Sequence, residues 1–212
     1  MGNIKPVSVL AIACFMALSF SASAESDMIK VPGGEFKSGD KGVTAKVAAF
    51  EIDKHEVTNA EFKNFNKDFS IPDGKENHPV TEITYFDAED YCKSLGKRLP
   101  TGPEWEKAAR GEDGREYPWG NDFDSTKANT LESGLTNTSA VGAYAGGASP
   151  YGVLDMCGNV WEWVDQYSSD EKKYRIVMGG SFFDKKENSK AYSILKSIPD
   201  DSHTYIGFRC AK

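Results

Sequence analysis

The chain has 212 residues, which is about one domain's length, and it carries a net charge of −7 with 39% hydrophobic and 27% charged residues. The 12% of aromatic residues argues against a disordered chain, and the 20 glycines and 9 prolines argue against a helical bundle. An acidic chain without a block of Lys or Arg is a poor candidate for binding nucleic acid or an anionic membrane, because clustered basic residues drive both.

The N-terminus has the pattern of a secretory signal peptide. Val7–Phe20 is mostly apolar and is followed by the small residues Ala22–Ala24. The apolar run is too short for a comfortable membrane span, and the spacing before Cys14 does not match a lipoprotein signal. We expect cleavage after residue 24 and a mature domain at 25–212, exported to the periplasm or secreted, without stable membrane insertion. An uncleaved anchor is the alternative.

The first part of the mature chain predicts strands and then a helix. Met28–Phe36 is a strand pattern broken by a Pro-Gly-Gly turn, and Lys46–Ile52 is a second strand candidate. Thr58 and Glu61 have the spacing of a capping box, which predicts a helix to about Asn66.

Two further helices and three short strands follow. Asp87–Leu95 is a helix candidate ended by Gly96, and Thr101 with Glu104 repeats the capping-box spacing for a helix that stops at Gly111. Residues 115–152 show no regular period, and loops of this length are usually functional or tied down. The strand candidates are Trp161–Val164, Ile176–Met178 and Ile206–Cys210. The sequence predicts one loop-rich α+β domain.

Six short segments, taken together and in order, resemble one known family. They are FEIDKHEVTN (50–59), YCKSLGKRLPT (91–101), YPWG (117–120), DMCGNVWEW (155–163), GGSF (179–182) and GFRCA (207–211). The set is similar to the formylglycine-generating enzymes, also called sulfatase-modifying factors, and covers essentially the whole mature chain. The resemblance implies an elaborated C-type-lectin-like α+β fold with long loops, little regular secondary structure and bound calcium.

The resemblance also implies calcium ligands. One site would combine two carboxylates with two backbone carbonyls, at Asp155, Glu162, Gly158 and Val160. Such oxygen ligands in flexible geometry suit calcium. A second site would begin at Asn129 and Thr130, but its later ligands fall in a stretch that is shortened here. From the residues alone, Asp155 could instead cap a turn, and Glu162 could be a solvated or hydrogen-bonded residue of a strand.

The cysteines have separate expected roles. In the family, a cysteine of the Tyr-Cys helix pairs with the one in the terminal Gly-Phe-Arg-Cys, so the resemblance implies a disulfide between Cys92 and Cys210. Two buried free thiols are the alternative. Cys157 is the unpaired cysteine, which is either buried and inert or an intermolecular or redox-active thiol.

The main departure from the family lies after Gly179-Gly180-Ser181. The generating enzymes carry two cysteines there, which bind copper(I) and activate oxygen, and copper(I) prefers such soft thiolates. The matching positions here are Asp184 and Ser189. We therefore expect neither copper binding nor the oxidation of cysteine to formylglycine. Trp161 and Ser181 match retained pocket residues, so Trp161, Ser181 and Asp184 form the candidate cleft.

These observations favour a calcium-stabilised, non-catalytic binding or accessory domain. Its partner would be a periplasmic protein, a peptide or a small polar ligand. The alternative is an oxidoreductase of the formylglycine-generating type, or of the siderophore-maturation type known among relatives that lack the cysteine pair, acting on a periplasmic protein or peptide. Such an enzyme would use a carboxylate such as Asp184 or Glu187, or Cys157 if its thiol were exposed beside Ser181.

Overall fold

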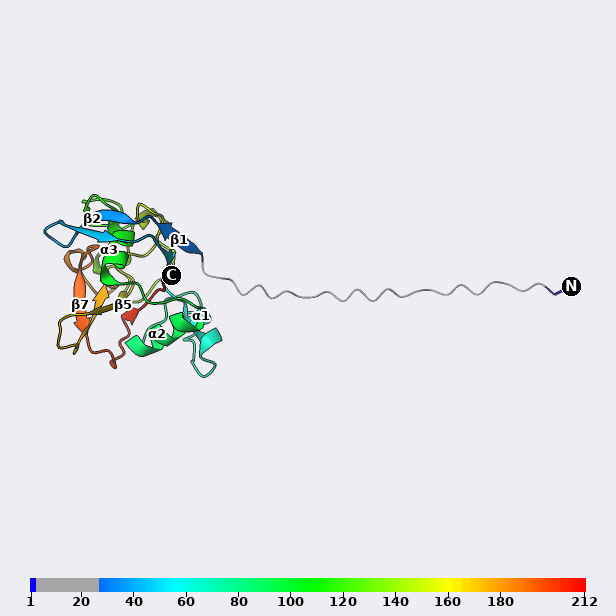
Figure 1. Ribbon diagram of the computed structural model, residues 1–212. Helices are drawn as coiled ribbons and strands as arrows, with labels where there is room; N and C mark the ends of the chain where they lie inside the picture. The colour runs from blue at the N-terminus through cyan, green and yellow to red at the C-terminus, as the bar shows by residue number, and fades with distance from the viewer. Residues whose placement is uncertain (3–26) are drawn as a thin grey trace.

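The structure is a computed structural model that describes residues 1–2 and 27–212 (Figure 1). The signal-peptide prediction falls on residues 1–24 and so lies almost entirely outside the described residues. In the described part of the chain, no helix has the length and apolar character needed to cross a membrane.

Two small antiparallel sheets come first along the described chain. Their strands are β1 (Met28–Val31) with β4 (Phe50–Asp53), and β2 (Gly34–Ser38) with β3 (Val43–Val47). The predicted Pro-Gly-Gly break is confirmed: a Cβ on Gly33 would lie 2.7 Å from the backbone nitrogen of Ala49, so only glycine fits this turn. The single strand predicted at 46–52 is wrong. The chain leaves one sheet after Val47 and enters the other at Phe50.

Within the part of the chain that the structure describes, a threonine N-cap that makes a capping box precedes each α-helix. The helices are α1 (Asn59–Phe65), α2 (Tyr85–Ser94) and α3 (Gly102–Arg110), and their N-caps are Thr58, Thr84 and Thr101. Helix α2 starts two residues before the predicted Asp87, because Asp87 itself closes a capping box with Thr84. The predicted ends of α1 and α3 are confirmed by the C-caps at Asn66 and Gly111.

A four-stranded sheet in the order β7-β6-β5-β8 forms the C-terminal half. Its strands are β5 (Trp161–Tyr167), β6 (Arg175–Met178), β7 (Ile194–Ser197) and β8 (Ile206–Gly207). Strand β7 was not predicted, and β8 is shorter than the predicted 206–210. Between α3 and β5 the regular structure consists of the 3₁₀ turns η1 (Leu131–Ser133) and η2 (Ala145–Gly147), as expected for a loop-rich region.

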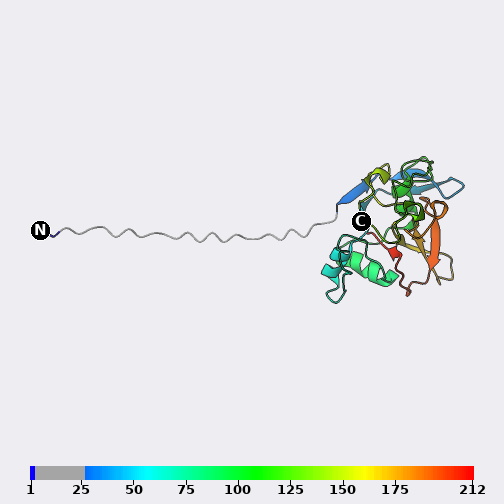
Figure 2. The same ribbon diagram turned by 180° about the vertical axis from the view of Figure 1, so that it is seen from behind.

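The core divides into two large apolar clusters on either side of β5. One packs α1 and α2 against Trp161, Trp163 and β8, and the other packs α3 with Trp105 against β1, β4 and β6. In both views α1 and α2 lie at the opposite end of the molecule from the β2–β3 hairpin (Figures 1 and 2).

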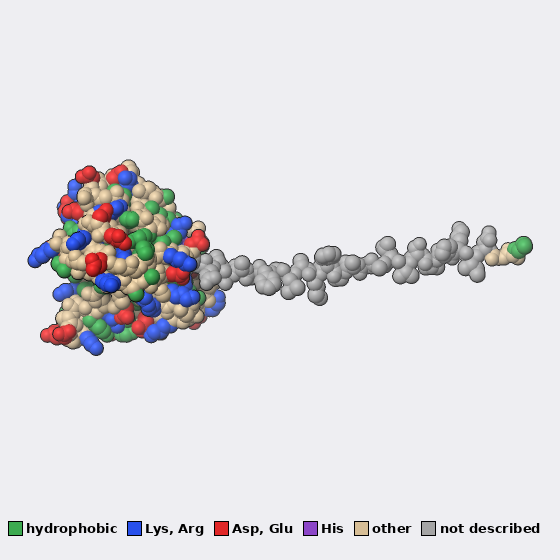
Figure 3. Space-filling view, turned by 45° about the horizontal axis from the view of Figure 1, so that its top comes forward, with side chains coloured by type: hydrophobic (Ala, Val, Ile, Leu, Met, Phe, Trp, Pro, Cys, Tyr) green, Lys and Arg blue, Asp and Glu red, His purple; other side chains and the backbone are tan. Residues whose placement is uncertain are grey.

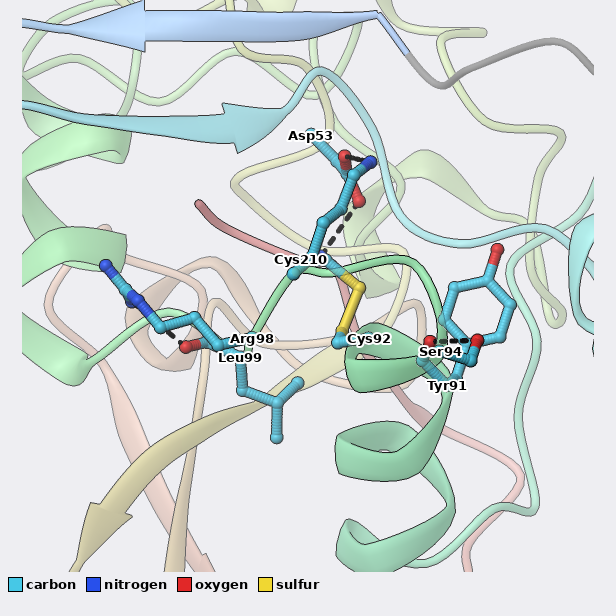
Figure 4. Close-up of a disulfide and its surroundings, with 8 residues drawn as sticks. Asp53, Tyr91, Cys92, Ser94, Arg98, Leu99 and Cys210 are labelled. Carbon is cyan, nitrogen blue, oxygen red and sulfur yellow. Dashed lines mark hydrogen bonds and ion pairs between the residues drawn. A yellow bond between two sulfur atoms is a disulfide. The ribbon is translucent and has the colours of Figure 1, made fainter.

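A disulfide joins α2 to the C-terminal segment. Cys92 and Cys210 are bonded across a sequence separation of 118 residues, which is the pairing that the family resemblance implies (Figure 4). The carboxylate of Asp53 lies beside it, accepting from the backbone N–H of Cys210 at 2.9 Å and pairing with Lys97 at 2.8 Å. The loop-rich α+β prediction is confirmed.

Candidate functional site

Trp161, Ser181 and Asp184 come together around one carboxylate oxygen. Oδ2 of Asp184 accepts hydrogen bonds from the indole Nε1–H of Trp161 at 2.7 Å and from the hydroxyl of Ser181 at 2.6 Å. Trp161 is the first residue of β5, Ser181 follows β6, and Asp184 lies three residues further on. The three residues predicted as the cleft therefore do form one cluster.

The two glycines before Ser181 make this arrangement possible. Gly179 has φ 101°, and a Cβ there would lie 2.9 Å from the ring of Trp105; Gly180 has φ 80°, and its Cβ would lie 2.3 Å from the hydroxyl oxygen of Ser189. Residues with side chains rarely adopt such backbone angles. Only glycine therefore fits at positions 179 and 180, where the chain passes between Trp105 and Ser189. This path brings the Ser181 hydroxyl within hydrogen-bond distance of Asp184.

The loop that contains Asp184, residues 181–186, is also hydrogen-bonded to η1. The N–H of Leu131 donates to the carbonyl of Asp184 at 2.9 Å, and the carboxylate of Glu132 accepts from the N–H of Lys186 at 3.1 and 3.2 Å. The position of Asp184 thus depends on the long loop that precedes it as well as on β5 and β6.

The donor atoms at this cluster are hard oxygens. Asp184 offers a carboxylate held by two strong donors, and the hydroxyl of Ser189 is fully buried and donates to the carbonyl of Lys185 at 3.3 Å. Copper(I) selects soft sulfur ligands, so these two side chains do not suit it. Glu187, the other carboxylate considered from the sequence, is exposed.

A groove of about 590 Å³ adjoins this cluster, and we call it the Phe183 groove. Phe182 and Phe183, which link Ser181 to Asp184, form part of its wall. The other walls come from the first residue of α1, the loop after α1, the segment after η1, and the residues before β8: Asn59, Phe69, Ser70, Pro72, Lys75, Pro79, Thr81, Glu82, Thr136, Asn137, Thr138, Thr204 and Tyr205.

Three of the four residues expected to hold calcium lie on one tight loop leading into β5, and the fourth, Glu162, is the second residue of that strand. Asp155 is buried with a φ of 57°, and its Oδ2 accepts from the N–H of Gly142 at 2.6 Å. Gly158 and Val160 lie on the same loop, also buried. Asp155 with backbone carbonyls is a donor set that fits calcium.

The side chain of Glu162 does not fit that role. Oε1 accepts from Nη2 of Arg209 at 2.7 Å, while Oε2 accepts from Nε of Arg209 at 2.7 Å and from the indole of Trp105 at 2.8 Å. The pair is completely buried. Both carboxylate oxygens of Glu162 thus accept hydrogen bonds from other protein groups. This corresponds to the alternative interpretation of Glu162 as a hydrogen-bonded strand residue.

Glu56 is a buried carboxylate near Asp155 that the sequence did not single out as a site residue. It is completely buried; Oε1 accepts from Nδ2 of Asn159 at 2.8 Å, whereas Oε2 has no hydrogen-bond donor. Burial raises the pKa of Glu56 well above its usual value, and the nearby Asp155 raises it further, although Arg209 acts in the opposite direction. A buried carboxylate in this state must be neutralised by a proton or a cation. In the sequence, Glu56 stands out only as part of the 50–59 segment that carries the family resemblance.

Asn129 and Thr130, expected to begin a second calcium site, are engaged in hydrogen bonds. The Oδ1 of Asn129 accepts from Ser133 at 3.1 Å, its Nδ2 donates to Asn159 at 3.2 Å, and the Thr130 hydroxyl donates to Glu132 at 2.8 Å. Within residues 1–2 and 27–212, no group of three or more His, Cys, Asp or Glu side chains is placed to hold a metal ion. A calcium ion would therefore need backbone carbonyl oxygens in addition to carboxylates.

Cys157 is buried rather than exposed at the cleft. It is 2% exposed, packs with Tyr117 and Ala128, and burial raises the pKa of its thiol. A buried neutral thiol is a poor nucleophile and metal ligand. The hypothesis that Cys157 replaces the family's reactive cysteines required an exposed thiol, and this condition is not met.

Comparison with known proteins places the chain in a family. The family model described as "Sulfatase-modifying factor enzyme 1-like domain" matches residues 17–212. The chain is 37% identical over 150 residues to the bovine (Bos taurus) protein named "Inactive C-alpha-formylglycine-generating enzyme 2", covering 63% of this chain and 50% of that protein. It is 34% identical over 177 residues to the formylglycine-generating enzyme of Thermomonospora curvata, covering 67% of this chain and 57% of the enzyme.

The structure of PvdO from Pseudomonas aeruginosa has the same fold, with a TM-score of 0.75, 22% sequence identity, and coverage of 87% of this chain and 93% of PvdO. Fold, motif order and family match together define a protein of the sulfatase-modifying-factor class. The chain belongs to the formylglycine-generating enzyme family. It spans between half and three-fifths of the length of the two relatives named above.

Proposed function

We propose that this protein is an exported, calcium-stabilised family member that binds a periplasmic protein, a peptide or a small polar ligand in the Phe183 groove and does not oxidise cysteine. The observation that carries the proposal is the Asp184 cluster. A carboxylate hydrogen-bonded to Trp161 and Ser181, with a buried serine at position 189, stands where the family resemblance requires two thiolates. One of the two relatives compared above is itself named inactive.

The test is copper(I) binding to the purified protein, measured under nitrogen against a colorimetric copper(I) chelator. We expect no equimolar, high-affinity site in the natural protein. The matched control is the double variant D184C/S189C, which returns thiolates to both positions and should compete with the chelator. Tight equimolar binding by the natural protein would overturn the proposal.

Calcium is the proposed stabilising ion, at the loop that contains Asp155. Its ligands would be the Asp155 carboxylate with the Gly158 and Val160 carbonyls, and the unpaired Oε2 of Glu56 supports a cation there. A bound ion raises stability by about 2.7 kcal/mol at a hundredfold excess over its Kd. Melting in calcium should therefore occur at a higher temperature than in a calcium chelator, with magnesium as the control, and identical melting curves would remove calcium from the proposal.

Export is supported by the N-terminal sequence and by the Cys92–Cys210 disulfide, since disulfides persist in oxidising compartments. A protein or neutral ligand is favoured over nucleic acid as a partner, because basic and acidic side chains are interspersed on the face seen in Figure 3. Fractionation of expressing cells, with N-terminal sequencing of the mature protein, tests the export.

The alternative, an oxidoreductase acting on a periplasmic protein or peptide, would rely on Asp184. That carboxylate is half-buried, and its Oδ2 already accepts two hydrogen bonds from within the protein. If Asp184 is catalytic, Asp184→Asn should abolish an oxygen-consuming activity that the natural protein shows. We expect no such activity in either protein.

A further inference from the structure

We propose that the Phe183 groove binds an uncharged, hydroxyl-rich ring, such as a sugar residue of a glycan, stacked on Phe183. The proposal rests on the proposed function, because it names the ligand class of the same cleft. Three features of the groove carry it: an exposed aromatic face, a set of hydroxyls, and a lining whose charges cancel.

Phe183 presents an open aromatic surface. Its side chain is 71% exposed, although phenylalanine is normally buried. The ring lies nearly parallel to that of Tyr205, at an interplanar angle of 17° and a centroid distance of 6.5 Å, and Tyr205 is in turn stacked on His203 at 5.1 Å. Tyr205 thus lies beside the Phe183 ring, and the exposed remainder of the ring surface is open to a ligand.

The polar lining consists mainly of hydroxyl groups. Among the described residues, the hydroxyls of Ser70, Thr81, Thr136 and Thr204 make no hydrogen bond to another protein group, and all four line the groove. A hydroxyl both donates and accepts hydrogen bonds. It therefore pairs well with another hydroxyl, whereas carboxylates or phosphates are bound better by Lys, Arg or backbone N–H groups.

The charges of the groove do not favour an ionic ligand. Its charged lining residues are Lys75 and Glu82, which carry opposite signs. The Lys75 ammonium already donates to the carbonyl of Thr138 at 3.4 Å and lies 3.3 Å from His78. The volume of about 590 Å³ is in the range of small-ligand sites. An aromatic platform beside hydroxyls with balanced charge matches a neutral ring that has apolar faces and a polar edge.

The test is titration of the purified full chain with three neutral trisaccharides, maltotriose, cellotriose and tri-N-acetylchitotriose, followed by calorimetry and saturation-transfer NMR. We expect at least one to bind saturably at millimolar concentration. Phe183→Ala should weaken that binding by about five- to tenfold, the loss of one stacking contact, and Thr204→Val should weaken it as well. Phe86→Ala is the matched control, because Phe86 is 44% exposed on α2 and does not line the groove.

Two outcomes would overturn the inference: no saturable binding of any of the three sugars, or sugar binding that Phe183→Ala leaves unchanged. Phe183-dependent binding of a tyrosine-containing tripeptide in place of the sugars would also overturn the ligand class while leaving the proposed function intact. Failure of the proposed function has a different signature, which is tight copper(I) binding without any sugar present.

Discussion

At the scale of single residues, the buried guanidinium of Arg209 lies between Glu162 and a set of backbone carbonyls. Besides its two bonds to Glu162, it donates to the carbonyls of Asp53, Lys54 and Leu154 at 3.2, 3.3 and 2.9 Å. These carbonyls belong to the end of β4 and to the loop before Asp155. One side chain therefore joins the C-terminal segment to the candidate calcium loop.

Replacing Arg209 by Met should destabilise the protein by about 3–5 kcal/mol, because it leaves the Glu162 carboxylate buried without its partner. Arg115→Met is the matched control: its ion pair with Asp113 lies at the surface, where such pairs contribute at most about 1 kcal/mol. Urea unfolding of both variants measures the difference. Equal urea midpoints for the two variants would show that the buried Arg209–Glu162 pair does not contribute more to the free energy of unfolding than the surface pair does.

Glu56 leads to a prediction about pH. In the folded state the pKa of Glu56 is raised above its usual value of 4.5. At a pH between the unfolded-state pKa and the folded-state pKa, the folded protein therefore holds a proton that the unfolded chain has lost. In a calcium chelator, the free energy of unfolding should therefore fall as pH rises through this window. Glu56→Gln removes the titration and should flatten the fall. A variant with the same pH dependence as the natural protein would contradict the assignment.

At the scale of secondary structure elements, the capping threonines set where the helices begin. Thr101 accepts from the N–H of Glu104 at 3.4 Å, and Glu104 accepts in return from the N–H of Thr101 at 2.9 Å and from Arg98. Burial alone would raise the pKa of Glu104, but its hydrogen bonds from Arg98 and Thr101 outweigh this and lower it. The start of α3 is therefore tied to the preceding Lys-Arg-Leu-Pro segment.

Thr101→Ala should cost about 1 kcal/mol of stability, the usual loss for an N-cap. Thermal unfolding followed by circular dichroism measures it, with Thr126→Ala in an exposed turn as the control. If Thr101→Ala and Thr126→Ala have the same melting temperature, the N-cap of α3 does not contribute to global stability.

The same elements explain which parts of the fold the sequence could predict. Capping boxes and the Pro-Gly-Gly turn are local signals, so the sequence predicts α1, α3 and the strand break at Gly33. Strand β7 was missed because its sequence, Ile194-Leu195-Lys196-Ser197, has two apolar residues followed by two polar ones and lacks the alternation that marks a strand. The break at Ala48-Ala49 was missed because the segment 47–50 that contains it is continuously apolar.

The candidate site follows a similar rule. The family motifs located Trp161, Ser181 and Asp184, which the structure joins through one oxygen. Glu56 was not found, because its role arises from contact with Asn159, which is 103 residues away in the sequence. Glu162 was assigned to calcium, and only the structure shows that Arg209 occupies its carboxylate.

At the scale of the whole molecule, the Cys92–Cys210 bridge closes most of the domain into one loop. In the chain-entropy model, a disulfide across about 100 residues contributes about 4.7 kcal/mol. The double variant C92A/C210A should therefore unfold at a much lower urea concentration, whereas Cys157→Ala, which removes only a buried thiol, should have a small effect. Similar midpoints for the two variants would mean that the bridge does not determine global stability.

The central claim is that a carboxylate fixed by Trp161 and Ser181 stands where copper(I) would bind in a generating enzyme. The indole N–H resonance of Trp161, assigned with a Trp161→Phe variant, tests it directly by ¹⁵N NMR. We predict that this resonance moves in Asp184→Ala, because its hydrogen-bond acceptor is lost, and stays in place when copper(I) is added to the natural protein. A shift that saturates at one equivalent of copper(I) would contradict the account.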